Sequence, residues 1–190
     1  SSNILGTLKA ILNVALEYEE IDRVPVIRME RVPKKDPKFL AEEEVAALLT
    51  ATPTQWQPLV ATAIFAGLRR GELIELRWHD IQFDDRRSPY IRVRRSVEIA
   101  NRTYRVKETK GNSCRSVPLA QTLRGILLRH RPASWRGEDL VFAERPSQTP
   151  SGHLRERVLW ETVDTAARAA GIRRHVHPHM LRHTYASLLI

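Results

Sequence analysis

Three short segments of this sequence carry side chains that could bind an anion or transfer a proton. Arg69 follows Gly67 at the end of an apolar stretch, and Lys110 opens a turn-forming Lys-Gly-Asn-Ser segment. His179 and Arg182 belong to a His-Met-Leu-Arg-His cluster at the start of an expected helix. Guanidinium groups bind oxyanions with forked hydrogen bonds, and lysine and histidine can act as acids or bases. Taken alone, Arg69 is typical of a surface arginine and Lys110 of a solvated turn, whereas the last cluster is the strongest signal.

The spacing of apolar residues predicts the elements that must position these side chains. Apolar residues recur at helical spacing along most of the chain, but from Ile81 to Leu119 the period changes to two. We therefore predict an α+β fold, a mostly helical core with a small antiparallel three-stranded sheet at about residues 81–119. The expected strands are 90–94, 103–107 and 115–119. The expected helices are about 3–20, 41–51, 59–66, 72–76, 121–130, 152–170 with Ser151 as N-cap, and 178 to the end.

The last expected helix has two different faces. Pro178 is suited to its first position. Helical geometry then places His179, Arg182, His183 and Ala186 together on a polar face. Leu181, Tyr185 and Leu188 are expected to face the core.

The charge of the chain is strongly basic and unevenly distributed. Lys and Arg total 31 against 22 Asp and Glu, so the net charge is +9. Acidic and basic side chains balance in residues 1–100, and the whole excess lies in residues 101–190. Arginines outnumber lysines, which suits forked contacts to phosphate. This pattern favours nucleic-acid binding over a solvated basic surface.

Two further features of the composition bear on the environment of the protein. Cys114 is the single cysteine, which excludes an intramolecular disulfide and a cysteine-based zinc cluster, and we interpret it as a structural thiol. No apolar run approaches the roughly 20 residues that span a bilayer. We expect a cytoplasmic protein with no membrane partner.

The N-terminal part is expected to be separate from the rest. The helix at about residues 3–20 has one apolar face that it cannot bury by itself, and a proline- and lysine-rich stretch follows it. We predict that residues 1–24 end a domain that is otherwise missing here, that 25–38 form a linker, and that 39–190 form the main domain.

In this order, the motifs resemble those of the tyrosine recombinase or phage integrase family. Arg69, in Gly-Leu-Arg, and Arg182, in His-Met-Leu-Arg, match the two arginines of that family. Lys110 matches its hairpin lysine and His179 its second-motif histidine. Glu72 matches an acidic position that supports the first arginine. The resemblance covers nearly all of the chain, residues 1–24 being similar to the end of the core-binding domain and 39–190 to the catalytic domain.

The resemblance implies a site-specific DNA recombinase that cleaves and rejoins strands through a covalent phosphotyrosine. It implies that Arg69 and Arg182 clamp the nonbridging oxygens of the phosphate, that Lys110 protonates the departing oxygen, and that His179 assists at the phosphate. Double-stranded DNA is the implied partner, bound by a homotetramer of the full-length protein, whereas the present fragment is expected to be monomeric. No cofactor or metal is expected, because the guanidiniums supply the charge.

The family's nucleophilic tyrosine has no match in this sequence. It is expected downstream of Ile190, and Tyr185 is no substitute, because it is predicted to pack in the core. The resemblance therefore implies a catalytic domain that is truncated before the nucleophile, and a fragment that binds DNA without cleaving it.

Three other interpretations compete with this one. A metal site at His175, His177 and His179 is disfavoured by Pro178 and by the lack of a nearby cysteine or acidic ligand. A noncatalytic DNA-binding module explains the basic charge but not the co-occurrence of the motifs. A type IB topoisomerase shares the clamp chemistry, although the short motifs favour a recombinase.

Overall fold

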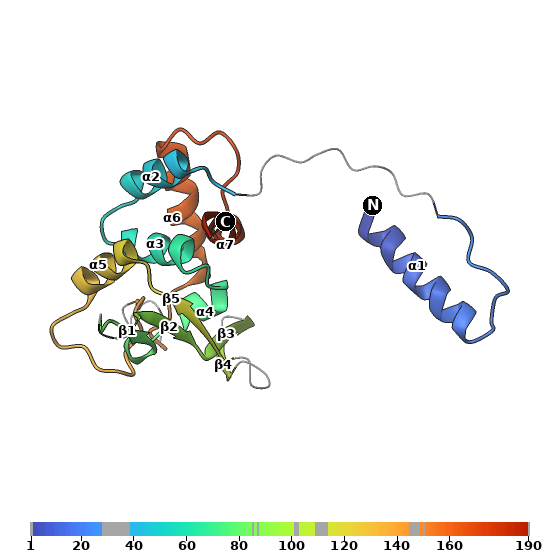
Figure 1. Ribbon diagram of the computed structural model, residues 1–190, viewed down its shortest axis with the longest axis horizontal. Coiled ribbons are helices and arrows are strands. Elements are labelled where there is room, and N and C mark those ends of the chain that lie inside the picture. The colour runs from blue at the N-terminus through green and yellow to red at the C-terminus, as the bar shows by residue number, and fades with distance from the viewer. Residues whose placement is uncertain are drawn as a thin grey trace. The chain divides into compact units, whose positions relative to one another are not determined.

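The computed structural model divides the chain into two compact units, Ser1–Asp36 and Pro37–Ile190 (Figure 1). The structure describes residues 2–27, 39–84, 86, 88–100, 103–108, 114–144, 149 and 151–189. Most of the expected linker, 25–38, lies outside these residues. Among the described helices, none combines the length and the apolar character needed to cross a membrane.

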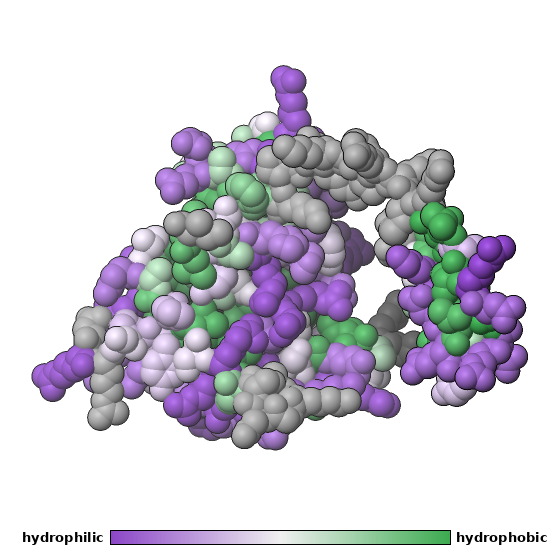
Figure 2. Space-filling model, turned by 45° about the vertical axis from the view of Figure 1, so that its right-hand side comes forward, coloured by the Kyte–Doolittle hydropathy of each residue, from purple (hydrophilic) through white to green (hydrophobic). Residues whose placement is uncertain are grey.

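The first unit contains helix α1, Ser2–Glu17, which begins and ends close to the predicted bounds. Its apolar face is not buried, because the side chains of Ile4, Leu8 and Ile11 are exposed. This face is visible as a green strip on the helix at the right of Figure 2. The apolar face that its amphipathic pattern predicts is therefore left exposed to solvent.

The second unit is organised around helix α3, Gln57–Phe65. Every residue from Pro58 to Ile64 is buried, so the helix is apolar on all sides rather than amphipathic. It packs against all the other helices of this unit, as Figure 1 shows for α2, α5 and α7. These helices are α2 Glu42–Ala51, α4 Arg70–Ile74, α5 Gln121–His130, α6 Glu156–Ala169 and α7 Pro178–Leu188.

Two small antiparallel sheets complete the unit and confirm the α+β class. The three-stranded sheet has the order β1-β2-β5, formed by Ile81–Gln82, Tyr90–Val93 and Arg115–Pro118. The second sheet pairs β3, Arg95–Ala100, with β4, Thr103–Glu108. The predicted strand at 103–107 is thus present but lies in a separate hairpin. Its partner β3 is a strand for which no prediction was made.

Helix α6 begins at Glu156, four residues later than predicted, and its N-cap is Arg155 rather than Ser151. The preceding residues remain extended for a tertiary reason. His153 forms a β-bridge with Ala143, and its Nε2 lies 2.6 Å from Oε2 of Glu75. Burial of this histidine therefore overrides the local helical preference.

Two buried carboxylates, at the end of α4 and in the short helix that follows it, form ion pairs in the region around the sheets. The carboxylate of Glu75 is fully buried and accepts hydrogen bonds from Arg77, Nε to Oε1 at 2.8 Å, and from His153. Asp80, in the short 3₁₀ helix η1 (Trp78–Asp80), accepts from Nε of Arg94 at 2.8 Å and from Arg95 at 3.0 Å. Buried carboxylates need such partners, so these contacts specify how the strands are seated.

Helix α7 begins at Pro178, as predicted, and its N-cap is His177. Nδ1 of His177 accepts a hydrogen bond from the backbone N–H of Met180 at 3.1 Å. The buried face consists of Met180, Leu181 and Thr184. Leu188 was expected in the core but is 39% exposed, and it is the last residue of the helix.

Candidate functional site

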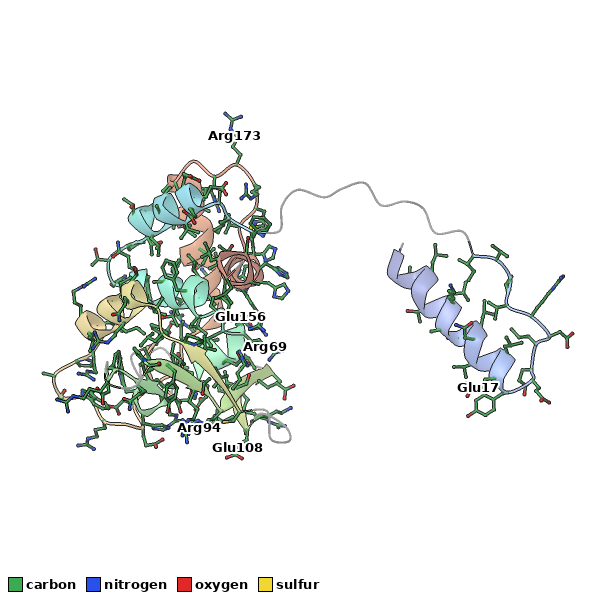
Figure 3. The ribbon with its side chains drawn as sticks, viewed as in Figure 1. Glu17, Arg69, Arg94, Glu108, Glu156 and Arg173 are labelled. Atoms are coloured by element: carbon green, nitrogen blue, oxygen red, sulfur yellow. The ribbon has the colours of Figure 1, made fainter. Side chains whose placement is uncertain are left out.

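A cleft of about 600 Å³ lies between α4, strand β3, and helices α6 and α7. Arg69, His179 and Arg182 all line it, although 110 residues of sequence separate the first from the second. Figure 3 shows Arg69 next to α7, where the helices meet the strands. Lys110, the fourth predicted site residue, lies outside the described residues. The fold thus brings together the three predicted residues that it describes.

Gly67 joins the two arginine motifs. Its φ is +56°, in the left-handed region that favours glycine. A Cβ at this position would lie 2.3 Å from Cδ1 of Tyr185, so the Tyr185 ring packs directly on the turn. The guanidinium of Arg182 donates a hydrogen bond to the Gly67 carbonyl. The turn at Gly67 therefore carries Arg69 two residues further along the chain, and its carbonyl group holds the Arg182 side chain, which comes from α7.

Arg69 is the N-cap residue of α4 and projects into solvent, with 65% of its side chain exposed. Its position is fixed from beneath by Glu72, whose side chain is only 2% exposed. Oε2 of Glu72 accepts from the Arg69 backbone N–H at 2.7 Å, and Oε1 accepts from Nη1 of Arg69 at 3.1 Å. The acidic position expected to support the first arginine does contact it.

Three guanidinium groups shape the electrostatics of the cleft. Partial burial, followed by the charges of Arg69 and Arg115, lowers the pKa of Arg182. Like charges at short range repel one another, and the negative charge of a bound anion would offset that repulsion. The cleft is therefore suited to an oxyanion such as a phosphate.

Several histidines gather around the start of α7, and one of them, His179, lines the cleft. The rings of His179 and His183 meet edge to face, with their centroids 4.5 Å apart. Desolvation and the neighbouring His175, His179 and His183 lower the pKa of His177, which suits its role as a neutral hydrogen-bond acceptor at the helix N-cap. Within the described part of the chain, no three His, Cys, Asp or Glu side chains are grouped to hold a metal ion.

Contacts of α4 with α6 and β3 border the cleft. Arg70 forms an ion pair with Glu156 of α6, and the same carboxylate accepts from Nε1 of Trp160 at 3.3 Å. Gly71 allows β3 to approach closely, because a Cβ there would lie 2.4 Å from the Val97 carbonyl oxygen. These contacts set the width of the cleft next to Arg69.

Arg115 is a residue of this site that the sequence analysis did not single out. It opens strand β5, and its guanidinium forms two hydrogen bonds to Glu72, at 2.8 and 2.6 Å. In the sequence it is one of many arginines in a basic stretch. Only its pairing with a buried carboxylate distinguishes it, and no local pattern reveals that pairing.

Glu72 should make stability depend on pH. Burial opposes its ionisation, but hydrogen bonds from Arg115 and from the Arg69 backbone hold its pKa below the ordinary value of 4.5. A lowered folded-state pKa stabilises the fold above the unfolded-state pKa, and this contribution is lost as pH falls through the folded-state pKa. In the wild type the free energy of unfolding should decrease as the pH falls below about 5, and in Glu72→Gln this decrease should be smaller. Urea titration at each pH measures it.

The matched control is Glu98→Gln, because Glu98 pairs with Lys107 at the surface, where water and salt weaken the interaction. It should change the pH dependence less than Glu72→Gln does. Equal curves for the wild type and Glu72→Gln would contradict this prediction.

The structure thus shows an α+β domain with an arginine-lined cleft, and comparisons with known proteins identify its class. The model of the phage integrase family matches residues 38–190. A tyrosine recombinase of Thermosipho africanus is 30% identical over 172 residues, covering 86% of this chain and 52% of its own length. Tyrosine recombinase XerA of Thermococcus onnurineus is 31% identical and covers 100% of this chain and 62% of its own length. The chain belongs to the tyrosine recombinase, or phage integrase, family.

Solved structures agree with this assignment. The crystal structure of XerA recombinase superposes with a TM-score of 0.62 at 26% identity, covering 93% of this chain and 58% of that one. The Tn1549 transposon integrase superposes with a TM-score of 0.73 at 17% identity, covering 98% and 65%, which shows a shared fold. The chain spans little more than half the length of the recombinases that it matches.

Proposed function

We propose that this chain forms the phosphate-binding core of a site-specific DNA recombinase that cleaves and rejoins strands through a covalent phosphotyrosine. The observation that carries the proposal is the convergence of Arg69, His179 and Arg182 on one cleft of a recombinase fold. In this scheme residues 39–190 belong to the catalytic domain. Helix α1, with its exposed apolar face, belongs to the end of a core-binding domain.

Arg69 and Arg182 would bind the nonbridging oxygens of the phosphate that is attacked. Negative charge accumulates on these oxygens as phosphorus becomes five-coordinate, and preorganised donors stabilise that state more than the ground state. The two arginines are suited to this role, because Glu72 fixes the first and the Gly67 carbonyl holds the second. Little side-chain reorganisation is then needed during the reaction.

Proton transfer would fall to Lys110 and His179. When the tyrosine oxygen forms its bond to phosphorus, the bond to the departing sugar oxygen breaks, and that oxygen takes a proton from Lys110. The assignment of Lys110 depends on its motif, Thr-Lys-Gly-Asn. His179 lies in the cleft beside Arg182 and would hydrogen-bond the phosphate or accept the tyrosine proton.

None of the four tyrosines of the chain is the proposed nucleophile. Tyr185 packs on Gly67, and the hydroxyl of Tyr90 accepts a hydrogen bond from Arg92 at 2.9 Å. Tyr104 stacks on His153, with the ring centroids 5.1 Å apart, and Tyr18 has none of the family's motifs beside it. We propose that the attacking tyrosine is supplied by chain outside residues 1–190.

Double-stranded DNA is the proposed substrate and partner. A Tn1549 integrase was solved in complex with a circular intermediate DNA, and a XerH recombinase bound to its difH substrate. The excess of basic over acidic residues in 101–190 supports the same partner here. Assembly of the full-length protein as a tetramer on DNA stays a prediction, and the mass of the complex in solution tests it.

Binding of the 190-residue chain to duplex DNA should be weak, largely independent of sequence and steeply dependent on salt. Each phosphate that a basic side chain neutralises releases counterions, giving a slope of about −0.9 in a plot of log K against log salt. Fluorescence anisotropy with a labelled duplex at several salt concentrations measures this slope. Arg182→Ala should reduce its magnitude by about one phosphate contact.

Arg168→Ala is the matched control, because Arg168 is 75% exposed and paired with Asp164 on α6. It should leave the slope unchanged. Binding that does not depend on salt, or no binding to duplex DNA at low ionic strength, would contradict the proposal.

A further inference from the structure

The contacts of Glu72 form a closed set between two arginines. Oε1 accepts from Nη1 of Arg115 at 2.8 Å and from Nη1 of Arg69 at 3.1 Å. Oε2 accepts from Nη2 of Arg115 at 2.6 Å and from the Arg69 backbone at 2.7 Å. Each oxygen therefore receives one hydrogen bond from each arginine. The carboxylate is buried between them, with 2% of its side chain exposed.

The two arginines differ in what holds their backbones. Arg115 opens β5 and pairs with Val93 of β2 in the three-stranded sheet. Arg69 lies on the turn before the five-residue helix α4, and most of its side chain is in solvent. Arg115, whose backbone is held in the sheet and whose side chain is 33% exposed, thus forms a bidentate pair with the Glu72 carboxylate. This carboxylate in turn orients Arg69, the more exposed arginine.

We propose that Arg115 is a positioning residue for the phosphate clamp. From its place on the sheet, Arg115 binds the Glu72 carboxylate, and this carboxylate fixes the direction of the Arg69 guanidinium. The role as part of a clamp depends on the proposed function. Burial alone would favour a neutral Glu72, and the hydrogen bonds from Arg115 oppose that effect. Without the two bonds from Arg115, the Glu72 carboxylate would be held only by Arg69 itself, so loss of Arg115 should loosen the Arg69 guanidinium.

A direct contact between Arg115 and the phosphate is the competing explanation. The structure favours positioning, because both terminal nitrogens of Arg115 are already bonded to Glu72. Arg115→Lys separates the two roles. Lysine keeps the positive charge that a phosphate contact needs, but it cannot form the two-pronged bond to a carboxylate.

The first experiment observes Arg69 directly in the 190-residue chain without DNA. We expect ¹⁵N relaxation of the Arg69 side-chain Nε–Hε group to show a clear loss of order in Arg115→Lys. The control is Arg157→Lys, which makes the same change in an arginine that is 81% exposed and paired with Glu161 on α6. It should leave Arg69 unchanged. Equal order of Arg69 in the wild type and Arg115→Lys would overturn the proposal.

The second experiment measures the rate of covalent adduct formation on a nicked duplex, in a full-length chain that includes the nucleophile. Misplacement of a catalytic group commonly costs up to about 10²-fold in rate, so we expect a loss of roughly 10- to 100-fold for Arg115→Lys. In a double-mutant cycle, Arg115→Lys should cost little more once Glu72→Gln is present. Independent, multiplying losses would show direct contact and overturn the proposal.

The two experiments also separate this inference from the proposed function. If the unsubstituted full-length chain forms no adduct, the recombinase proposal fails, while the relaxation measurement still decides whether Arg115 orders Arg69. Thermal unfolding of Arg115→Lys and of the double variant identifies any general loss of folding. Should Arg115→Lys unfold the domain, Glu72→Gln with Arg115 intact tests the contact through which Arg115 is proposed to act, and an Arg69 side chain as ordered as in the wild type would then overturn the proposal.

Discussion

Arg182→Ala should lower the rate of covalent protein–DNA adduct formation by about 10²–10³-fold in a full-length chain that includes the nucleophile. The substitution removes one of the two guanidiniums proposed to bind the nonbridging oxygens. It also removes the hydrogen bond to the Gly67 carbonyl, which holds α7 against the turn bearing Arg69. Quenched-flow gels with a nicked suicide duplex measure the rate under single-turnover conditions.

Two variants define what the loss means. Arg182→Lys keeps the charge but not the fork, and it should recover only part of the rate. Arg168→Ala removes an exposed arginine of α6 and should leave the rate unchanged. All variants should remain folded, because the part of α7 that packs in the core is formed by Met180, Leu181 and Thr184. If Arg182→Ala lowered the rate by only about threefold, instead of the expected loss of about 10²-fold or more, the clamp would be contradicted.

The 190-residue chain should form no covalent adduct with a nicked duplex, whereas a full-length chain should form one. The reason is geometric, since Tyr185 is packed against Gly67 and Tyr104 is stacked on His153. An attacking oxygen must instead reach the phosphorus in line with the departing one, within about 3–3.5 Å. Denaturing gels and peptide mass spectrometry identify any labelled tyrosine.

Tyr185→Phe in the full-length chain serves as the control and should keep adduct formation, because only a hydroxyl is lost. An adduct on Tyr185, or on any other of the four tyrosines, would contradict the assignment. It would also mean that the nucleophile lies within residues 1–190.

Much of the fold was predictable because its signals are local. Helix α5 and the start of α7 were predicted correctly from apolar spacing and from Pro178. The failures occurred where tertiary contacts decide. Because His153 is buried against Glu75, helix α6 begins later in the chain than predicted. Likewise, β4 pairs with β3 instead of joining the other strands, a choice between partners that a two-residue period cannot make.

The candidate site was predictable in part for the same reason. The Gly-Leu-Arg and His-Met-Leu-Arg motifs identify Arg69, His179 and Arg182 as candidate residues, because each motif combines a chemical group with a local backbone signal. Arg115 carries no such signal. Its importance comes from facing a buried carboxylate 43 residues earlier in the chain.

The sequence by itself therefore determined the family, the α+β class and the identity of the main candidate residues, since these depend on residue types and short spacings. Only the tertiary structure decided how those residues meet: Arg182 on the Gly67 carbonyl, Tyr185 over the turn, and Arg115 holding Glu72 beneath Arg69. The physical reason is that hydrogen bonds and close packing act over a few ångströms in space. Residues far apart in the chain acquire their roles only when folding brings them within that distance.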